Sequence, residues 1–253
     1  MRQLTEDVTF LRAGAPVAFL GKGPRNERSP RCWQNKSMGF PDRSKAGRLL
    51  AQKLAGYANN PDVVVLALPR GGVPVGFEVA CSLNVPLDII VVRKLGVPNH
   101  EELAMGAIAS GNVRVLNNDT IDWLQISSVV IERVTEIEKT ELERRESIYR
   151  GTTPPLDPAG KIVILVDDGI ATGSTMRAAV AVVRSRNPQR VVIAVPTAPV
   201  STADELRNEA DDFVTIITAE VFVGVGQWYD DFRQVSDEVT RDLYECARRR
   251  WCR

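Results

Sequence analysis

The chain has 253 residues, enough for one α/β domain with a well-buried core, and its 44% hydrophobic and 25% charged residues are typical of a globular protein. Lysine plus arginine and aspartate plus glutamate both number 32, which argues against a nucleic-acid or membrane partner. No apolar run approaches the roughly 20 residues of a membrane helix and no signal peptide is recognisable, so we expect a cytoplasmic protein. The four cysteines include no C-x-x-C pair and the chain has one histidine, which argues against a zinc site. We expect the cysteines to be reduced thiols.

Residues 1–37 differ from the rest of the chain, because their apolar residues show neither a helical nor a strand periodicity over any length. An amphipathic helix pattern begins shortly after Met38, and its apolar positions are Ala46, Leu49, Leu50 and Leu54. We therefore expect residues 1–37 to be a poorly ordered extension or an upstream misassigned start, with Met38 as the native initiator. Residues 38–253 would form the functional domain.

Five short apolar runs predict the strands of a central sheet. They cover residues 63–68, 87–92, 162–166, 191–195 and 213–217. Runs rich in β-branched residues and without polar alternation are typical of strands buried on both faces. Helical patterns follow at residues 73–83, 176–185 and 201–210, the last with Ser201 or Thr202 as its expected cap. This order predicts a doubly wound parallel sheet.

A long excursion separates the second and third of these strands. Two apolar runs, residues 103–109 and 113–116, flank a glycine-containing turn and predict a hairpin. Residues 120–149 predict one or two helices with a break near residues 126–128. The densely charged part, residues 130–150, has an apolar stripe beneath it and is typical of a solvated amphipathic helix.

Two acids and a hydroxyl-rich turn follow the third predicted strand. Asp167 and Asp168 come directly after residues 162–166, at the edge where open α/β sheets bind ligands. Residues 171–175, A-T-G-S-T, then open a helix whose free N–H groups can hold a phosphate. Carboxylates accept hydrogen bonds from sugar hydroxyls, and the neighbouring turn can hold a phosphate. Together they suit a sugar phosphate such as ribose 5-phosphate. An ordinary turn followed by a helix cap is the plain structural alternative, and the sequence lacks a P-loop motif.

Two basic segments also follow predicted strands. Residues 69–72, Pro-Arg-Gly-Gly, lie between a strand and a helix, which favours an anion site with a guanidinium beside it. Arg93 and Lys94 stand at the carboxyl end of residues 87–92, where adjacent cations suggest a nearby anion. A plain turn with a surface arginine, and solvated charges at a strand end, are the alternatives.

Residues 161–176 resemble the 5-phosphoribosyl-1-pyrophosphate (PRPP) motif of the type I phosphoribosyltransferases, with an apolar run, two acids, three small or apolar residues and Thr-Gly. The Pro-Arg-Gly-Gly segment resembles the pyrophosphate loop of that family, which often has a strained or cis peptide. The A-T-G-S-T ending looks most like the adenine and uracil enzymes, and Ala171 replaces an aspartate usual in the hypoxanthine-guanine branch. The resemblance implies a doubly wound parallel sheet of about five strands with a mobile hairpin loop and a small C-terminal hood.

The resemblance also implies roles for individual residues. Asp167 and Asp168 would be the catalytic acids and would hold the ribose hydroxyls directly or through Mg²⁺. The ribose and 5′-phosphate would be bound by Asp167, Asp168, Gly169, Ala171, Thr172, Gly173, Ser174 and Thr175. The pyrophosphate would be bound by Arg70, Gly71, Gly72, Arg93 and Lys94. The acceptor pocket would include Ile170, Trp228 and Tyr229, and the mobile loop His100, Glu101 and Glu102.

The function implied by the resemblance is transfer of the phosphoribosyl group from PRPP to a nitrogenous acceptor, a nucleobase or related compound, in nucleotide metabolism. Mg²⁺ would be the cofactor, PRPP and a small acceptor the partners, and a homodimer is compatible with the family. Two alternatives remain. One is a non-catalytic regulator that senses PRPP or a nucleotide, although the only basic stretch suited to nucleic acid is residues 248–253. The other is an interaction module that uses the charged helix at residues 130–150.

Overall fold

The structure, a computed structural model, describes residues 39–111 and 113–251, which belong to one compact unit, Ser37–Arg253. The predictions for residues 1–37 and for Met38 lie outside the described residues, as do those for the side chains of Glu101 and Glu102. Within the described ranges, no helix is both long enough and apolar enough to span a membrane.

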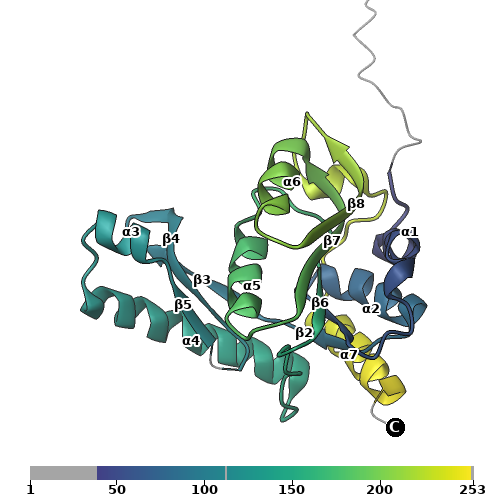
Figure 1. Cartoon of the computed structure of the whole chain (residues 1–253), viewed down its shortest axis with the longest axis horizontal. Helices are drawn as coiled ribbons and strands as arrows, with labels where there is room; N and C mark the ends of the chain where they lie inside the picture. Colours follow the sequence, from purple (N-terminus) through teal and green to yellow (C-terminus); the bar gives the residue numbers. More distant parts are fainter. Residues whose placement is uncertain (1–38, 112, 252–253) are drawn as a thin grey trace, which may run out of the picture. The chain divides into compact units, whose positions relative to one another are not determined.

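A five-stranded parallel sheet forms the centre of the unit, as the sequence predicts (Figure 1). Its strands are β1 (Val63–Ala67), β2 (Leu87–Ile89), β6 (Ile162–Val166), β7 (Arg190–Pro199) and β8 (Asp212–Ala219). Their order across the sheet is β2-β1-β6-β7-β8, and each neighbouring pair is parallel. The strand order therefore reverses between β1 and β6, where sheets of this kind bind ligands at the carboxyl ends of the strands.

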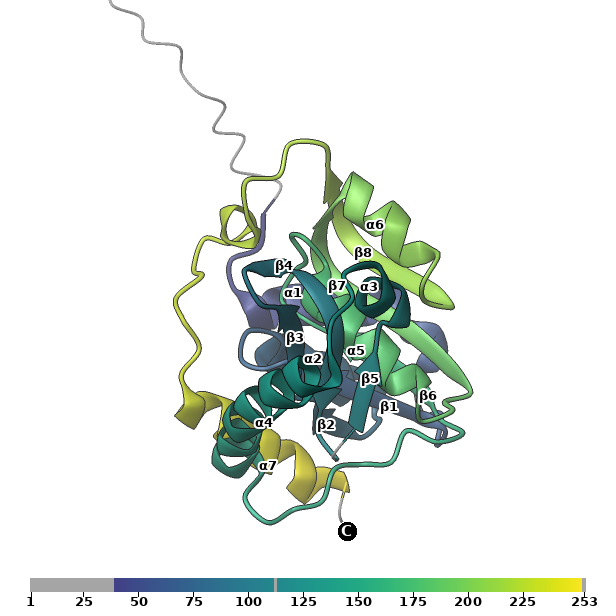
Figure 2. The same ribbon diagram turned by 90° about the vertical axis from the view of Figure 1, so that its left-hand side faces the viewer.

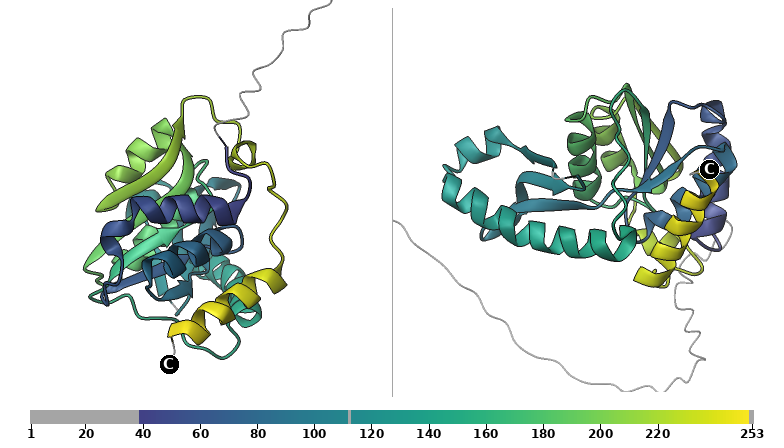
Figure 3. Two further views of the ribbon diagram at one scale, coloured as in Figure 1. Left: turned by 90° about the vertical axis from the view of Figure 1, so that its right-hand side faces the viewer. Right: turned by 90° about the horizontal axis from the view of Figure 1, so that it is seen from below.

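Helices cover both faces of this sheet (Figures 1 and 3). One face carries α1 (Arg43–Lys53), α2 (Gly72–Leu83) and α7 (Asp237–Trp251), and the other carries α5 (Ser174–Arg184) and α6 (Val200–Arg207). Along β1, Val63 and Val65 pack into the core beneath the first group, whereas Val64 and Leu66 pack into the core beneath the second. The apolar runs lack polar alternation because both faces are buried.

The excursion after β2 forms a second, antiparallel sheet that extends to one side of the central sheet (Figures 1 and 2). The strands of this sheet are β3 (Val92–Val97), β4 (His100–Ala109) and β5 (Val113–Leu116). Two helices of the excursion follow, α3 (Asn118–Trp123) and α4 (Ser128–Arg150). The predicted hairpin and the predicted break between two helices are both confirmed. Asn117 and Ser127 cap the two helices, since their side chains accept hydrogen bonds from Thr120 and Val130 amides.

The predicted strand at residues 87–92 is wrong in its extent. β2 ends at Ile89, and Val92 already belongs to β3, where it pairs with Ala109 of β4. The apolar run contains no turn residue, so only the pairing of β3 with β4 shows that the chain has left the central sheet. Arg93 and Lys94 consequently lie inside an antiparallel strand and not at the carboxyl end of a central one.

Two further boundaries differ from the sequence predictions. β7 continues past Pro196 to Pro199, because it stays paired with β8 as far as Ala219. α6 begins at Val200 with Pro199 as its N-cap, and no side chain caps it. Thr202, one of the two expected caps, donates its hydroxyl to the carbonyl of Ala171 at 2.9 Å. The short 3₁₀ helices are Ala55–Tyr57 and Val225–Trp228.

Candidate active site

Asp167 and Asp168 lie directly after β6, beside the point where the strand order reverses. The amide of Asp168 donates to the carboxylate of Asp167 at 2.8 Å. Burial raises the pKa of both carboxyl groups, and the negative charge of Asp168 raises the pKa of Asp167 further, well above its usual range. Two partly buried carboxylates held together favour hydrogen-bond donors or cations as ligands.

Arg43 is a residue of this site that the sequence analysis did not identify. Its Nε donates to Oδ2 of Asp168 at 2.7 Å, and the two side chains are only 10% and 13% exposed. The guanidinium charge lowers the pKa of Asp168 and so works against the effect of burial. The two residues are 125 positions apart, and an arginine at the start of an amphipathic helix is usually solvated. No local pattern therefore indicated the contact.

The loop after β1 lies against the acid pair. A Cβ atom placed on Gly71 would be 2.0 Å from Oδ2 of Asp168, and one placed on Gly72 would be 2.8 Å from Cα of Asp167. Only glycine permits so close an approach. The Pro69–Arg70 peptide bond is cis, which agrees with the resemblance to a pyrophosphate loop.

The hydroxyl-rich turn opens α5, which begins at Ser174 and not at residue 176. Gly173 is the N-cap residue, with a left-handed φ of 77° that favours glycine. The hydroxyls of Thr172 and Ser174 are hydrogen-bonded at 3.0 Å, and the Arg177 guanidinium donates to the Thr172 carbonyl at 2.9 Å. The turn thus forms the N-terminus of an 11-residue helix, whose free amides are suited to an anion.

The three predicted pyrophosphate cations have different surroundings. Nη1 of Arg70 lies 3.6 Å from Oδ1 of Asp237, and both side chains remain partly exposed. Nη2 of Arg93 lies 2.6 Å from Oε2 of Glu138 on α4, so a carboxylate already neutralises this cation. Lys94 lies on β3 and lines two cavities together with residues of α5.

A cavity of about 920 Å³ connects the β1 loop with the antiparallel sheet. Pro69 and Thr175 line one side of it, and Lys94 of β3 and Arg133 of α4 line another. A neighbouring cavity of about 660 Å³ includes Lys94, Ser174 and Arg177. Both volumes lie within the range of small-molecule sites, and the basic side chains suit an anionic ligand.

A family model described as phosphoribosyl transferase domain matches residues 42–233. The chain belongs to the phosphoribosyltransferase family. The matched residues include Arg43, the Pro-Arg-Gly-Gly loop, the acid pair and the hydroxyl-rich turn.

Named relatives and a solved structure agree with this family. Two Mycobacterium tuberculosis proteins with the provisional name phosphoribosyl transferase are 46% identical to the chain over 210 residues, which cover 83% of this chain and 47% of each relative. The chain therefore spans about half the length of these curated relatives. A crystal structure from Thermus thermophilus has 39% sequence identity and a TM-score of 0.76, and the match covers 82% of this chain and 98% of that one.

A third relative matches only part of the chain. The bifunctional protein PyrR of Pelotomaculum thermopropionicum is 31% identical over 110 residues, which cover 43% of this chain and 55% of that protein.

The residues predicted for an acceptor pocket differ in burial. Ile170 and Tyr229 are 3% and 7% exposed, so both side chains serve mainly as core residues. Trp228 is half-buried and packs near Phe222, with ring centroids 6.1 Å apart. His100 is exposed on β4. The acceptor roles of Ile170, Trp228 and Tyr229 stay predictions.

The carboxylates of the acid pair are of the kind that holds a magnesium ion. Among the described side chains, no three His, Cys, Asp or Glu residues gather into a metal-binding cluster. Mg²⁺ is usually held by one or two carboxylates together with water and substrate phosphates. Asp167 and Asp168 supply such carboxylates. A nearby cation would lower their raised pKa values.

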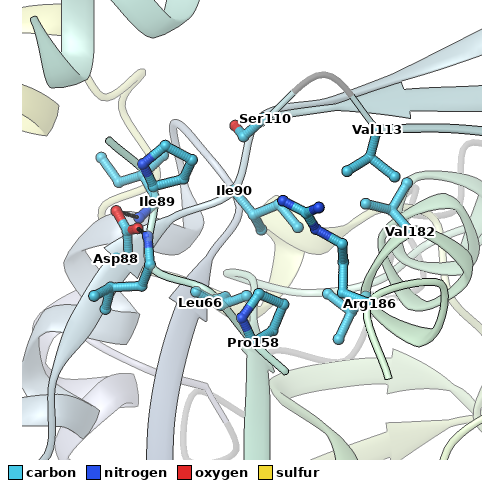
Figure 4. Close-up of a pocket in the computed structure, with 12 residues that line it drawn as sticks. Leu66, Asp88, Ile89, Ile90, Ser110, Val113, Pro158, Val182 and Arg186 are labelled. Carbon is cyan, nitrogen blue, oxygen red and sulfur yellow. Dashed lines mark hydrogen bonds between the residues drawn. The ribbon is translucent and has the colours of Figure 1, made fainter. Parts of the chain in front are cut away.

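A small cavity elsewhere in the unit is distinct from this site (Figure 4). It holds about 30 Å³ and lies between Asp88 and Ile89 of the β2 region, Ser110 and the end of α5, with Arg186 beside it. That volume admits on the order of one or two water molecules. None of the residues predicted to bind PRPP lines it.

Proposed function

We propose that this protein transfers the 5-phosphoribosyl group from PRPP to a nitrogenous acceptor and releases pyrophosphate. The observation that supports this most strongly is the contact between two separate loops at the point where the strand order reverses. Gly71 of the β1 loop lies against Asp168 of the β6 loop, where even one added carbon would collide. A leaving-group site and a sugar site would therefore adjoin each other, as substitution at the sugar requires.

On the sugar side, the carboxylates of Asp167 and Asp168 accept hydrogen bonds from the ribose hydroxyls. The 5′-phosphate binds at the N-terminus of α5, where Thr172, Ser174 and Thr175 add hydroxyl donors. During transfer the bond from C1 to the pyrophosphate oxygen breaks and a bond from C1 to the acceptor nitrogen forms. Positive charge develops on the ribose ring in this step, and the nearby carboxylates stabilise it.

On the leaving-group side, the amide of Gly71 and the guanidinium of Arg70 bind the pyrophosphate, and Lys94 assists from β3. The amide of Gly72 already donates to the carbonyl of Leu68 at 3.0 Å, so Gly72 contributes by its close approach to Asp167. Arg93 is the weaker candidate of this set, because Glu138 already pairs with it. A bound Mg²⁺ ion supplies charge neutralisation for the departing pyrophosphate. The protein itself mainly positions the reactants and holds fixed charges around them.

The direct experiment is to incubate the protein with PRPP, Mg²⁺ and a panel of purine, pyrimidine and related acceptors, and to follow pyrophosphate release. We expect release with at least one acceptor, and its loss in Asp168→Asn. Asp204→Asn is the matched control, since Asp204 lies on the exposed side of α6 in an ion pair with Arg207. PRPP binding without release for any acceptor would indicate a regulator and contradict the proposal.

A further inference from the structure

Arg43 joins the acid pair to the segment that follows β8. We call this segment, residues 222–233, the hood. Besides its contact with Asp168, the Arg43 guanidinium donates through Nη1 to the carbonyl of Arg233 at 2.9 Å. Its central carbon also lies 3.9 Å from the ring centroid of Phe232. One buried side chain therefore contacts the sugar site at one end and the hood at the other.

The backbone beside Arg43 is attached to the same hood. The amide of Phe40 donates to the carbonyl of Trp228 at 2.7 Å, and the amides of Asp230 and Asp231 donate to the carbonyls of Phe40 and Pro41 at 2.8 and 2.9 Å. Phe40 and Ala46 share a small core with Tyr229. The start of α1 and the hood thus form one packed element.

Tyr229 provides a second link between the hood and the acid pair. Its hydroxyl donates to the backbone carbonyl of Asp168 at 2.5 Å, and its ring lies 5.9 Å from the Arg43 guanidinium carbon. The hood is therefore connected both to the side chain of Asp168, through Arg43, and to its backbone. A shift of Asp168 would therefore move Arg43 and Tyr229, and both of these side chains also contact or belong to the hood.

We infer that Arg43 is a positioning residue that couples binding of a sugar phosphate at Asp168 to ordering of the hood. The inference rests on the proposed function, because it takes a ribose phosphate as the ligand of the acid pair. Without a ligand, the Arg43 guanidinium is the cation that stabilises the charge of Asp168, and the Asp168 amide donates to Asp167. Hydroxyls that bind the carboxylates fix Asp168, and through Arg43 they fix Phe232 and Arg233. Coupling of this kind is reciprocal, so an ordered hood would also strengthen sugar-phosphate binding.

The test is hydrogen exchange of the hood amides, read by mass spectrometry, with and without saturating ribose 5-phosphate and Mg²⁺. In the wild type we expect the ligand to slow exchange at Asp230 and Asp231 by roughly fivefold or more. Arg43→Lys keeps a cation beside Asp168 but cannot also donate to Arg233 and stack on Phe232. Because the coupling is reciprocal, it should bind ribose 5-phosphate more weakly, and at saturating ligand its hood should no longer respond. Arg48→Lys, an exposed position on the same helix, is the control.

Each outcome decides the inference. If Arg43→Lys binds the ligand and its hood responds as in the wild type, the inference is overturned while the proposed sugar site stands. If the wild type binds ribose 5-phosphate without any hood response, the same conclusion holds. If the wild type does not bind this ligand, the proposed function fails and the inference falls with it. Should Arg43→Lys fail to fold, Phe232→Leu decides, because it removes the stacking and keeps the charge; an unchanged hood response there overturns the coupling.

Discussion

Two arginine–carboxylate ion pairs in this unit differ in how completely the carboxylate is neutralised and hydrogen-bonded. The pair of Arg150 and Asp88 links the end of α4 to β2, and its side chains are 4% and 3% exposed. Nη1 of Arg150 lies 2.7 and 2.9 Å from the two Asp88 oxygens, which also accept from the amides of Ile89 and Leu156, each at 2.7 Å. Every side of this carboxylate has a partner, so the pair is structural.

The pair of Arg43 and Asp168 is equally short but incompletely compensated. A second carboxylate, Asp167, stands beside it, and burial holds the pKa of both acids above the ordinary value. The glycines of the loop after β1 pack directly against Asp167 and Asp168 and place no cation on them, whereas Arg150 and two backbone amides satisfy Asp88. The difference teaches that a binding site is recognised by charge left uncompensated, and not by the presence of an ion pair.

The largest effect is expected from breaking the structural pair. Arg150→Met would leave the charge of Asp88 buried without its cation, which costs about 3–5 kcal/mol. At about 2–4 °C per kcal/mol for a domain of this size, the melting temperature should fall by roughly 6–20 °C. Arg144→Met is the control on the same helix, because Arg144 is exposed. A fall no larger than that of the control would show that the pair is not structural.

The next effect concerns the leaving group. Arg70→Ala should lose roughly 1.5–3 kcal/mol of charge-assisted hydrogen bonding to pyrophosphate, about tenfold or more in affinity for PRPP or pyrophosphate. Ribose 5-phosphate lacks that group, so its affinity should hardly change. Calorimetry with the three ligands measures both. An equal loss for ribose 5-phosphate would mean that the loop as a whole is disturbed, and no loss at all would make Arg70 a surface arginine.

A steric comparison isolates the contact between the two loops. Gly71→Ala inserts a carbon that collides with Asp168, which should destabilise the protein by about 1–3 kcal/mol and disturb sugar-phosphate binding. The backbone of Gly71 is ordinary, with a φ of −60°, so the effect is purely steric. Gly56→Ala is the matched control, since an added Cβ there meets nothing within 4 Å. Thermal unfolding of the two variants should separate them; equal melting temperatures would contradict the close approach.

The smallest effect is a gain in stability. Because the pKa of Asp167 is raised in the folded state, its contribution to stability is present below the unfolded value of about 3.9 and is lost as the pH rises through the folded pKa. Asp167→Asn should therefore raise the melting temperature near about pH 7, by roughly 2–4 °C for each kcal/mol recovered. The gain should vanish at about pH 3, where both side chains are neutral. A gain that is independent of pH would exclude the charge as its cause.

The sequence allowed the central sheet and the acid pair to be predicted because both depend on local patterns. Each buried strand is an apolar run without polar alternation, and Asp167 and Asp168 follow one of them directly. The end of β2 could not be predicted, since the apolar run continues past Ile89 and tertiary pairing with β4 ends it. The role of Asp88 was equally hidden, because its partner Arg150 is distant in sequence.

Long-range contacts also explain what was missed at the site. Arg43 reaches Asp168 across 125 residues, and the cations on α4 face the cavity only because the antiparallel sheet positions that helix. Tyr229 was predicted only as an acceptor residue, and its burial with Phe40 and its contact with the acid pair could not be foreseen, because both depend on distant residues. Such residues are recognised by packing and not by motif.

The most direct test of the central claim is a calorimetric titration of PRPP with Mg²⁺ into the wild type, Asp168→Asn and Thr175→Ala. If the acid pair and the turn of α5 form the sugar-phosphate site, the wild type binds and each variant loses about tenfold or more in affinity. Wild-type affinity in both variants would place the site elsewhere and contradict the account.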